Sequence, residues 1–246
     1  MDSELDHFLG FPNDTLARKI LEAGTKKLSD IDSCKLGILL SMSSDEHLQD
    51  EARALLKKLT AKHDRTSPYM LLKWIIQIQN GKDINGNLEG MISDWAKQHP
   101  DDMVYSRSII WLKSRTRDNI EMIGAYVKHL ETFWRDDLSW FKLGNLYDEE
   151  KEYDRAAFSY EEAYALCPEH QEYLTAAAKS RLSIEAKTPK EKEENRTIAI
   201  KQLAKSVMMN DQDAVAWQLL IDNTTNETKR NKYIAYRKLV TKTKTD

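Results

Sequence analysis

Residues 137–170, DLSWFKLGNLYDEEKEYDRAAFSYEEAYALCPEH, decide the fold class of this chain. Trp140, Leu143 and Tyr147 recur at helical spacing, which places them on one face of a first helix. A polar, acidic turn follows, and a second apolar stripe then continues up to Pro168, which ends the second helix. The stretch therefore predicts two antiparallel helices joined by a short turn.

Two small residues, Gly144 and Ala156, stand where these helices must approach closely, and Tyr160 and Ala163 extend the apolar face of the second helix. With Asp137 as position 1 of a 34-residue unit, the stretch resembles the tetratricopeptide repeat, with Tyr instead of the usual Phe at position 24. The signature residues that match are Trp140, Leu143, Gly144, Tyr147, Ala156, Tyr160, Ala163 and Pro168. The resemblance implies a helix-turn-helix unit that stacks on its neighbours.

The same frame continues on both sides of this unit. The predicted repeat units are residues 35–68, 69–102, 103–136, 137–170, 171–213 and a partial unit at 214–240, of which the first is the weakest. We therefore predict an all-α protein in which residues 13–240 form a single right-handed superhelical solenoid of tetratricopeptide repeats, closed by a C-terminal capping helix at 230–240. Residues 1–12 are expected to be loose and residues 241–246 to be disordered.

One unit departs from the 34-residue spacing. The step from residue 171 to residue 214 is 43 residues, and the surplus lies in the charged stretch 185–196, EAKTPKEKEENR. Two interpretations stay open for this insertion. It is either an elongated helix end or solvated loop, or an insertion that binds a partner, because insertions in repeat proteins cluster on one face.

The composition excludes several classes of protein. With 37 Lys+Arg against 40 Asp+Glu, the net charge of −3 does not predict binding to nucleic acid. Only 8 glycines and 5 prolines are present, which argues against a turn-rich β fold. No apolar run approaches the roughly 20 residues that span a bilayer, and the N-terminus does not resemble a signal peptide. We expect a soluble, intracellular protein whose 2 cysteines are free thiols.

Catalytic chemistry has little support in the sequence. The 6 histidines are scattered, and no zinc-binding histidine motif, Gly-rich phosphate loop or nucleophile elbow is present. Cys34 and Cys167 are interpreted as small packing residues instead of nucleophiles. We therefore predict no catalytic residues, no metal site and no cofactor.

The first helices of such repeats line a concave groove, which is the surface where a partner is expected. The predicted groove residues are Lys73, Gln77, Arg107, Trp111, Phe141, Asn145 and Lys179. Trp111 and Phe141 are large aromatic residues on a face that should otherwise be solvated. They are either anchors for a bound segment or packing residues against the N-terminal helix or a neighbouring turn of the superhelix.

The C-terminus is more basic than the rest of the chain. The basic residues are Lys229, Arg230, Lys232, Arg237, Lys238, Lys242 and Lys244. They form either the polar face of the capping helix or a surface weakly attracted to an anionic membrane.

A closer resemblance covers roughly residues 69–220. It rests on NIEMI from residue 119, DDLSW from residue 136, YDRAAF from residue 153 and the Trp217 that follows an Asn-Asp turn. These motifs resemble the subunit 2 family of the endoplasmic reticulum membrane protein complex. The insertion at 185–196 departs from the family pattern.

That resemblance implies a non-catalytic scaffold at the cytosolic face of the endoplasmic reticulum membrane. Its partners would be other subunits of the complex, membrane-embedded and soluble, which together insert tail-anchored and multipass proteins. The chain would have no transmembrane segment of its own, and its membrane contact would be indirect or weak, through the basic C-terminus. The alternative function is a peptide-binding tetratricopeptide-repeat co-chaperone or assembly adaptor.

Overall fold

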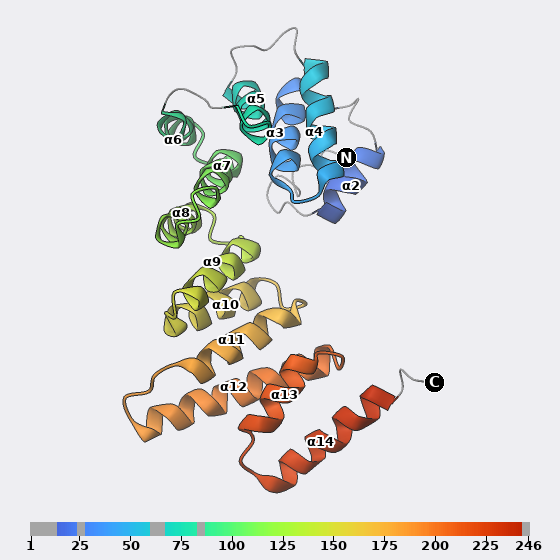
Figure 1. The fold of residues 1–246 in the computed structure, drawn as a ribbon, viewed down its shortest axis with the longest axis vertical. Helices are drawn as coiled ribbons and strands as arrows, with labels where there is room; N and C mark the ends of the chain where they lie inside the picture. Colours follow the sequence, from blue (N-terminus) through green and yellow to red (C-terminus); the bar gives the residue numbers. More distant parts are fainter. Residues whose placement is uncertain (1–13, 24–27, 60–66, 83–86, 243–246) are drawn as a thin grey trace. The chain divides into compact units, whose positions relative to one another are not determined.

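A computed structural model of the chain describes residues 14–23, 28–59, 67–82 and 87–242. Within these ranges the regular secondary structure is entirely α-helical, which confirms the all-α prediction (Figure 1). The predictions for residues 1–12 and for residues 243–246 of the tail fall outside the described residues. Residues 241–242 belong to the last helix.

The chain divides into two compact units, Met1–Phe133 and Trp134–Asp246. Unit 1 contains α2 (Asp14–Ala23), α3 (Asp30–Met42), α4 (Glu46–Leu59), α5 (Ser67–Gln79), α6 (Leu88–Gln98), α7 (Met103–Ser114) and α8 (Asn119–Thr132). Unit 2 contains α9 (Asp137–Glu149), α10 (Tyr153–Leu166), α11 (Gln171–Ser183), α12 (Pro189–Met209), α13 (Ala214–Asn223) and α14 (Glu227–Lys242).

Unit 2 is built by packing each helix against the next one in the sequence. α9 packs against α10, α10 against α11, α11 against α12 and α12 against α13, with a smaller contact between α13 and α14. Glu161 on α10 ties three of these helices together, since it accepts hydrogen bonds from Arg181 on α11 and Gln202 on α12, each at 2.6 Å. This consecutive packing is the arrangement of a helical repeat protein.

Small residues set the close approach of α9 and α10. A Cβ atom added at Gly144 would lie 2.6 Å from Cε1 of Tyr160, so only glycine fits there. Ala156 and Ala163 on α10 are fully buried. Leu143 and Tyr147 are also buried, and the turn that leaves α10 carries Pro168 just after the helix. The residues of the repeat signature therefore lie at helix contacts of unit 2.

Aspartates begin four of the helices. Asp102, Asp118, Asp136 and Asp213 are the N-cap residues of α7, α8, α9 and α13, and each side chain accepts a hydrogen bond from a backbone N–H of the first turn. Asp136 is buried and also accepts a hydrogen bond from Ser139 Oγ at 2.6 Å. The helix starts thus follow from local sequence, because these N–H groups have no partner inside the helix.

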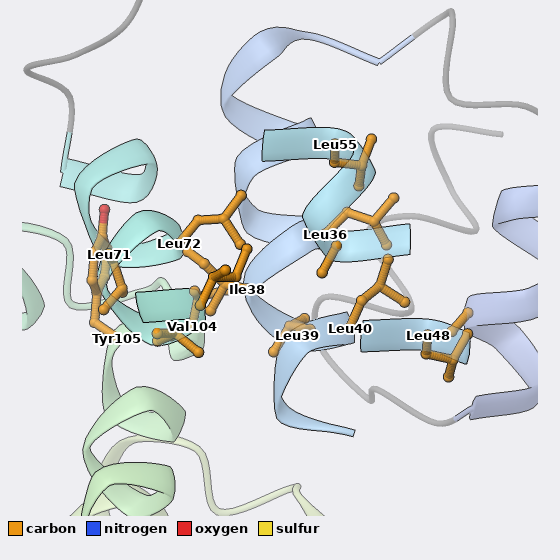
Figure 2. Close-up of a cluster of buried hydrophobic side chains, with 14 of the residues drawn as sticks. Leu36, Ile38, Leu39, Leu40, Leu48, Leu55, Leu71, Leu72, Val104 and Tyr105 are labelled. Carbon is orange, nitrogen blue, oxygen red and sulfur yellow. The ribbon is translucent and has the colours of Figure 1, made fainter. Parts of the chain in front are cut away.

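Unit 1 is organised around α3. This helix packs against α4 and α5 and also contacts α7, four helices further along the chain. Its residues Leu36, Ile38 and Leu40 are buried, and Figure 2 shows Ile38 beside Leu72 of α5 and Leu36 beside Leu55 of α4. From Leu36 to Ser41 every residue of α3 is buried, so this part of the helix has to be covered by several neighbours, which explains its central position.

The charged insertion extends a helix. Thr188 is the N-cap of α12, and its Oγ1 accepts a hydrogen bond from Glu191 N at 3.1 Å. Pro189 occupies the first turn, where a missing N–H has no cost. α12 therefore begins at residue 189, so residues 185–188 form a short connection and residues 189–196 add about two turns to the start of the helix. Likewise, the capping helix α14 extends beyond both ends of the predicted 230–240.

Candidate binding surfaces

The groove residues predicted in unit 2 lie close to one another. Phe141 is half-buried between two tyrosine rings, with ring centroids 5.4 Å from Tyr160 and 4.7 Å from Tyr173. Aromatic pairs at these separations stabilise each other, so part of the Phe141 side chain is used in packing within unit 2. Asn145 on α9 and Lys179 on α11 are both exposed.

The polar members of this face have partners within the chain. Asn145 Oδ1 accepts a hydrogen bond from the Tyr160 hydroxyl at 2.7 Å. Lys179 Nζ lies 3.5 Å from Asp148 Oδ2, and Ser180 Oγ donates to Asp148 Oδ1 at 2.8 Å. Burial, followed by the nearby charge of Asp148, raises the pKa of Tyr160. The tyrosine therefore stays protonated and keeps donating to Asn145 at neutral pH.

The groove residues predicted in unit 1 lie on two helices, Lys73 and Gln77 on α5, Arg107 and Trp111 on α7. Lys73 is exposed. Trp111 is half-buried, packs at the edge of the unit 1 core and has the Arg115 guanidinium 5.3 Å from its ring centroid. Each aromatic residue singled out in the sequence is thus partly packed within its own unit. A single groove through both units stays a prediction.

Unit 1 also contains a cavity that the sequence did not indicate. It has a volume of about 420 Å³ and is lined by residues of α6, α7 and α8. Ala96, Ile109 and Ala125 contribute apolar surface. Ser106 Oγ and His129 Nδ1, 2.8 Å apart, contribute polar atoms. Its lining residues come from three successive helices, so no local motif could have indicated the cavity.

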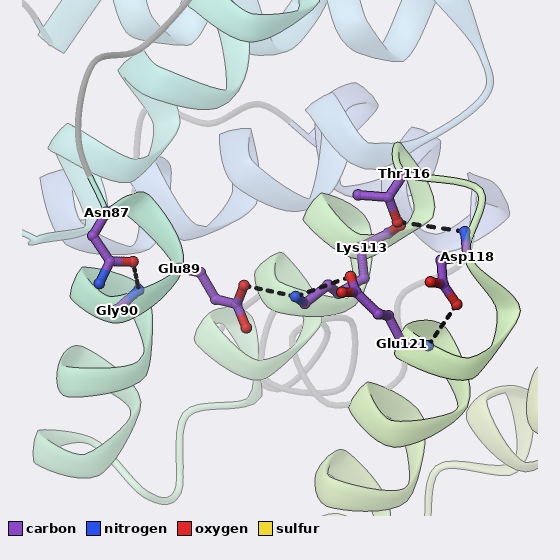
Figure 3. A network of polar contacts seen from close by, with 7 residues as sticks. All are labelled: Asn87, Glu89, Gly90, Lys113, Thr116, Asp118 and Glu121. Carbon is purple, nitrogen blue, oxygen red and sulfur yellow. Dashed lines mark hydrogen bonds and ion pairs between the residues drawn. The ribbon is translucent and has the colours of Figure 1, made fainter.

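A lysine bridges two glutamates beside this cavity. Lys113 Nζ lies 2.7 Å from Glu89 Oε2 and 3.1 Å from Glu121 Oε2, which joins α6, α7 and α8 (Figure 3). Glu89 and then Glu121 raise the pKa of Lys113 through these contacts. The ammonium group therefore stays charged over a wider pH range than that of a free lysine.

Large apolar side chains are exposed mainly on unit 2. Among the described residues of unit 2, the exposed large apolar residues are Trp134, Phe158, Ile198, Met208, Met209, Val215, Tyr236 and Leu239. Those of unit 1 are Ile31, Met91, Ile120 and Val127. Trp140 and Phe158 pack edge to face at 5.9 Å, and Trp140 Nε1 donates to the carbonyl of Trp134 at 2.8 Å. A contiguous exposed apolar patch marks a surface where proteins meet, whereas single exposed apolar residues are ordinary.

One group of side chains among the described residues has the composition of a metal site. Asp137, Cys167 and His170 offer ligand atoms that all lie within 4.8 Å of one another. Burial, followed by the neighbouring Glu169 carboxylate, raises the pKa of the Cys167 thiol to about 12. Cys167 and His170 are three positions apart in the sequence, whereas Asp137 comes from another helix, and the absence of a metal site stays a prediction.

Across the described ranges, no helix combines the length and the apolar character needed to cross a membrane. No model of a known protein family matches the chain, and no curated protein is significantly similar to it.

Proposed function

We propose that this chain is a non-catalytic tetratricopeptide-repeat scaffold that holds several partner proteins at once. The observation that carries the proposal is the consecutive packing of α9 to α13, with Gly144, Ala156 and Ala163 at the helix contacts. Stacked helix pairs present long continuous surfaces and bind through many dispersed contacts. A scaffold uses such surfaces without needing a reactive centre.

The exposed apolar side chains support the same function. Trp134 and Phe158 are more than half exposed, and Met208 is 86% exposed. Complete burial of an exposed apolar side chain is worth about 1.5–3 kcal/mol, and an interface that covered these groups would gain part of this. Their spread over both the beginning and the end of unit 2 favours more than one partner.

The particular scaffold that we propose is the cytosolic subunit of the endoplasmic reticulum membrane protein complex. This proposal rests on the resemblance of residues 119–123, 136–140 and 153–158 to the subunit 2 family. The chain would hold cytosolic parts of membrane-embedded subunits and dock a second soluble subunit. The assembled complex would insert tail-anchored and multipass membrane proteins.

A peptide-binding co-chaperone or assembly adaptor is the second candidate. The cavity between α6, α7 and α8 favours it, because about 420 Å³ is enough for one or two large side chains of a linear segment. Such an adaptor would depend on a single short ligand.

Purification of a tagged full-length chain from membranes extracted with a gentle detergent distinguishes the two functions. Mass spectrometry of the bound proteins should find a stoichiometric set of membrane-spanning subunits if the scaffold proposal is correct. Recovery of the chain from the cytosol, with chaperones or one soluble client, would contradict that proposal and favour the adaptor.

Substitutions in the two candidate anchors sharpen this test. Trp111→Ala or Phe141→Ala should weaken the assembly of a scaffold only partly, because its affinity is spread over many contacts. The same change should abolish binding by an adaptor that needs one anchor. Lys201→Ala, an exposed position on α12, is the matched control, and circular dichroism checks that each variant is folded.

A further inference from the structure

Three residues that commonly bind metal ions come together at the ends of three successive helices of unit 2. Asp137 is the first residue of α9, Cys167 is the C-cap of α10 and His170 is the N-cap of α11. One carboxylate oxygen, one sulfur and one ring nitrogen from these residues all lie within 4.8 Å of one another. Asp137 and Cys167 are 30 positions apart in the sequence, and the stacking of the helices brings them together.

Neighbouring side chains orient two of the three groups. The Tyr173 hydroxyl donates to Asp137 Oδ2 at 2.8 Å. The His170 ring stacks on the Tyr173 ring, with centroids 5.1 Å apart and an interplanar angle of 24°. His170 Nδ1 lies 2.8 Å from Glu172 Oε1. A histidine that donates Nδ1–H to a carboxylate has a lone pair on Nε2, which is the usual arrangement around histidine ligands of zinc.

We propose that Asp137, Cys167 and His170 form a binding site for Zn²⁺, with water in the fourth position. Sulfur and imidazole nitrogen select Zn²⁺ over Mg²⁺ and Ca²⁺, which prefer oxygen ligands. On binding, the Cys167 thiol loses its proton to solvent. The resulting thiolate and the Asp137 carboxylate together balance the two charges of the metal ion.

A metal ion at this position would link successive helices of unit 2. It would join the start of α9 to the turn between α10 and α11, and so connect the first helix of one repeat with the junction to the next. Because the metal binds the folded arrangement, it would stabilise unit 2 against unfolding. The proposal is independent of the identity of the partners and concerns the chain by itself.

Metal titration of the purified full-length chain tests the site. After treatment with a chelator and its removal, Co²⁺ is added as a spectroscopic substitute for Zn²⁺. We expect one equivalent to bind and to produce thiolate-to-cobalt charge-transfer absorption, which Zn²⁺ then displaces. Cys167→Ser should abolish this absorption. His170→Gln removes a direct ligand and should weaken Zn²⁺ binding by more than the roughly 10-fold minimum seen on loss of an outer-shell partner.

Two controls make the result specific. His47→Gln changes an exposed histidine on α4 of unit 1 and should leave Zn²⁺ affinity unchanged. Circular dichroism of each variant without metal verifies that loss of binding is not loss of folding. If the wild-type chain gives no charge-transfer absorption, or if Cys167→Ser retains it, the proposal is wrong. A thermal transition of the wild-type chain that does not rise with Zn²⁺ would also contradict it.

Discussion

The two units of this chain reach a folded state by different kinds of packing. In unit 1, branched aliphatic side chains from several helices converge on α3, and Leu36, Leu72 and Ile75 are almost completely buried. Among the described helices of unit 2, the main contacts pass from each helix to the next, and small and aromatic residues such as Ala156, Tyr160 and Ala177 are buried there.

This difference follows from the residues around each helix. α3 is buried over most of its surface, so it can only be accommodated inside a cluster of helices. Each of the helices α9 to α13 keeps one side exposed to solvent, so each can be covered by two neighbours. A regular stack thus forms where each helix needs to be covered on only part of its surface.

The largest effect is expected from a core truncation in unit 1. Leu72→Ala removes a completely buried side chain that packs on Gly37 of α3, so it leaves a cavity at the centre of the unit. We expect a loss of about 2–5 kcal/mol in the free energy of unfolding of unit 1. Hydrogen exchange measured by mass spectrometry should show faster exchange in α3, α4 and α5. Unchanged protection of these helices would contradict the central role of α3.

The next largest effect is expected from a substitution at the close contact between α9 and α10 in unit 2. Gly144→Ala would place a methyl group 2.6 Å from the Tyr160 ring and force this ring away from Asn145. We expect a loss of about 1–3 kcal/mol, measured by urea unfolding.

Gly124→Ala in α8 is the matched control for that substitution. A Cβ atom at Gly124 would meet no other atom within 4 Å, so the higher helix propensity of alanine should give a gain of up to about 1 kcal/mol. Equal effects of the two substitutions would show that the α9–α10 contact is not tight.

A smaller effect is expected at the start of unit 2. Asp136→Ala removes the buried N-cap of α9 together with its hydrogen bonds to the backbone N–H and the hydroxyl of Ser139. We expect a loss of about 0.5–2 kcal/mol. Asp118→Ala at the exposed N-cap of α8 should cost less, because water replaces the lost partner there. Thermal unfolding of both variants measures the difference.

The smallest effect concerns the ion pairs of unit 1. Lys113→Met should change the free energy of unfolding by no more than about 1 kcal/mol, because both glutamates are partly exposed to solvent. The pKa of Lys113 is raised above its ordinary value of 10.5. Its contribution should therefore be complete below about pH 10 and disappear as the pH rises through the raised pKa. Urea midpoints of both proteins at pH 7 and at alkaline pH measure this difference.

Much of the fold could be predicted from local sequence. The apolar stripe of Trp140, Leu143 and Tyr147 and the small residue at Gly144 define a helix pair without any knowledge of the rest of the chain. The surroundings of the groove residues could not be predicted in this way. Phe141 and Trp111 had two possible roles in the sequence, and only the neighbouring rings of Tyr160 and Tyr173 and the guanidinium of Arg115 reveal how much of each is already packed.

The structure of the insertion at residues 185–196 could not be predicted from its charge pattern alone either. Its charge pattern is compatible with a loop and with a helix, and the Thr188 cap followed by Pro189 selects the helix. Of the interpretations that the sequence left open for these residues, the structure has the elongated helix end.

The sequence by itself determined the helices, their N-caps and the consecutive order of packing in unit 2, because these depend on periodicity and on groups a few residues apart. The tertiary structure alone decided the central position of α3, the cavity between α6, α7 and α8, and the meeting of Asp137 with Cys167 and His170. These features arise from contacts between residues far apart in the chain, whose distances are set only when the helices pack together.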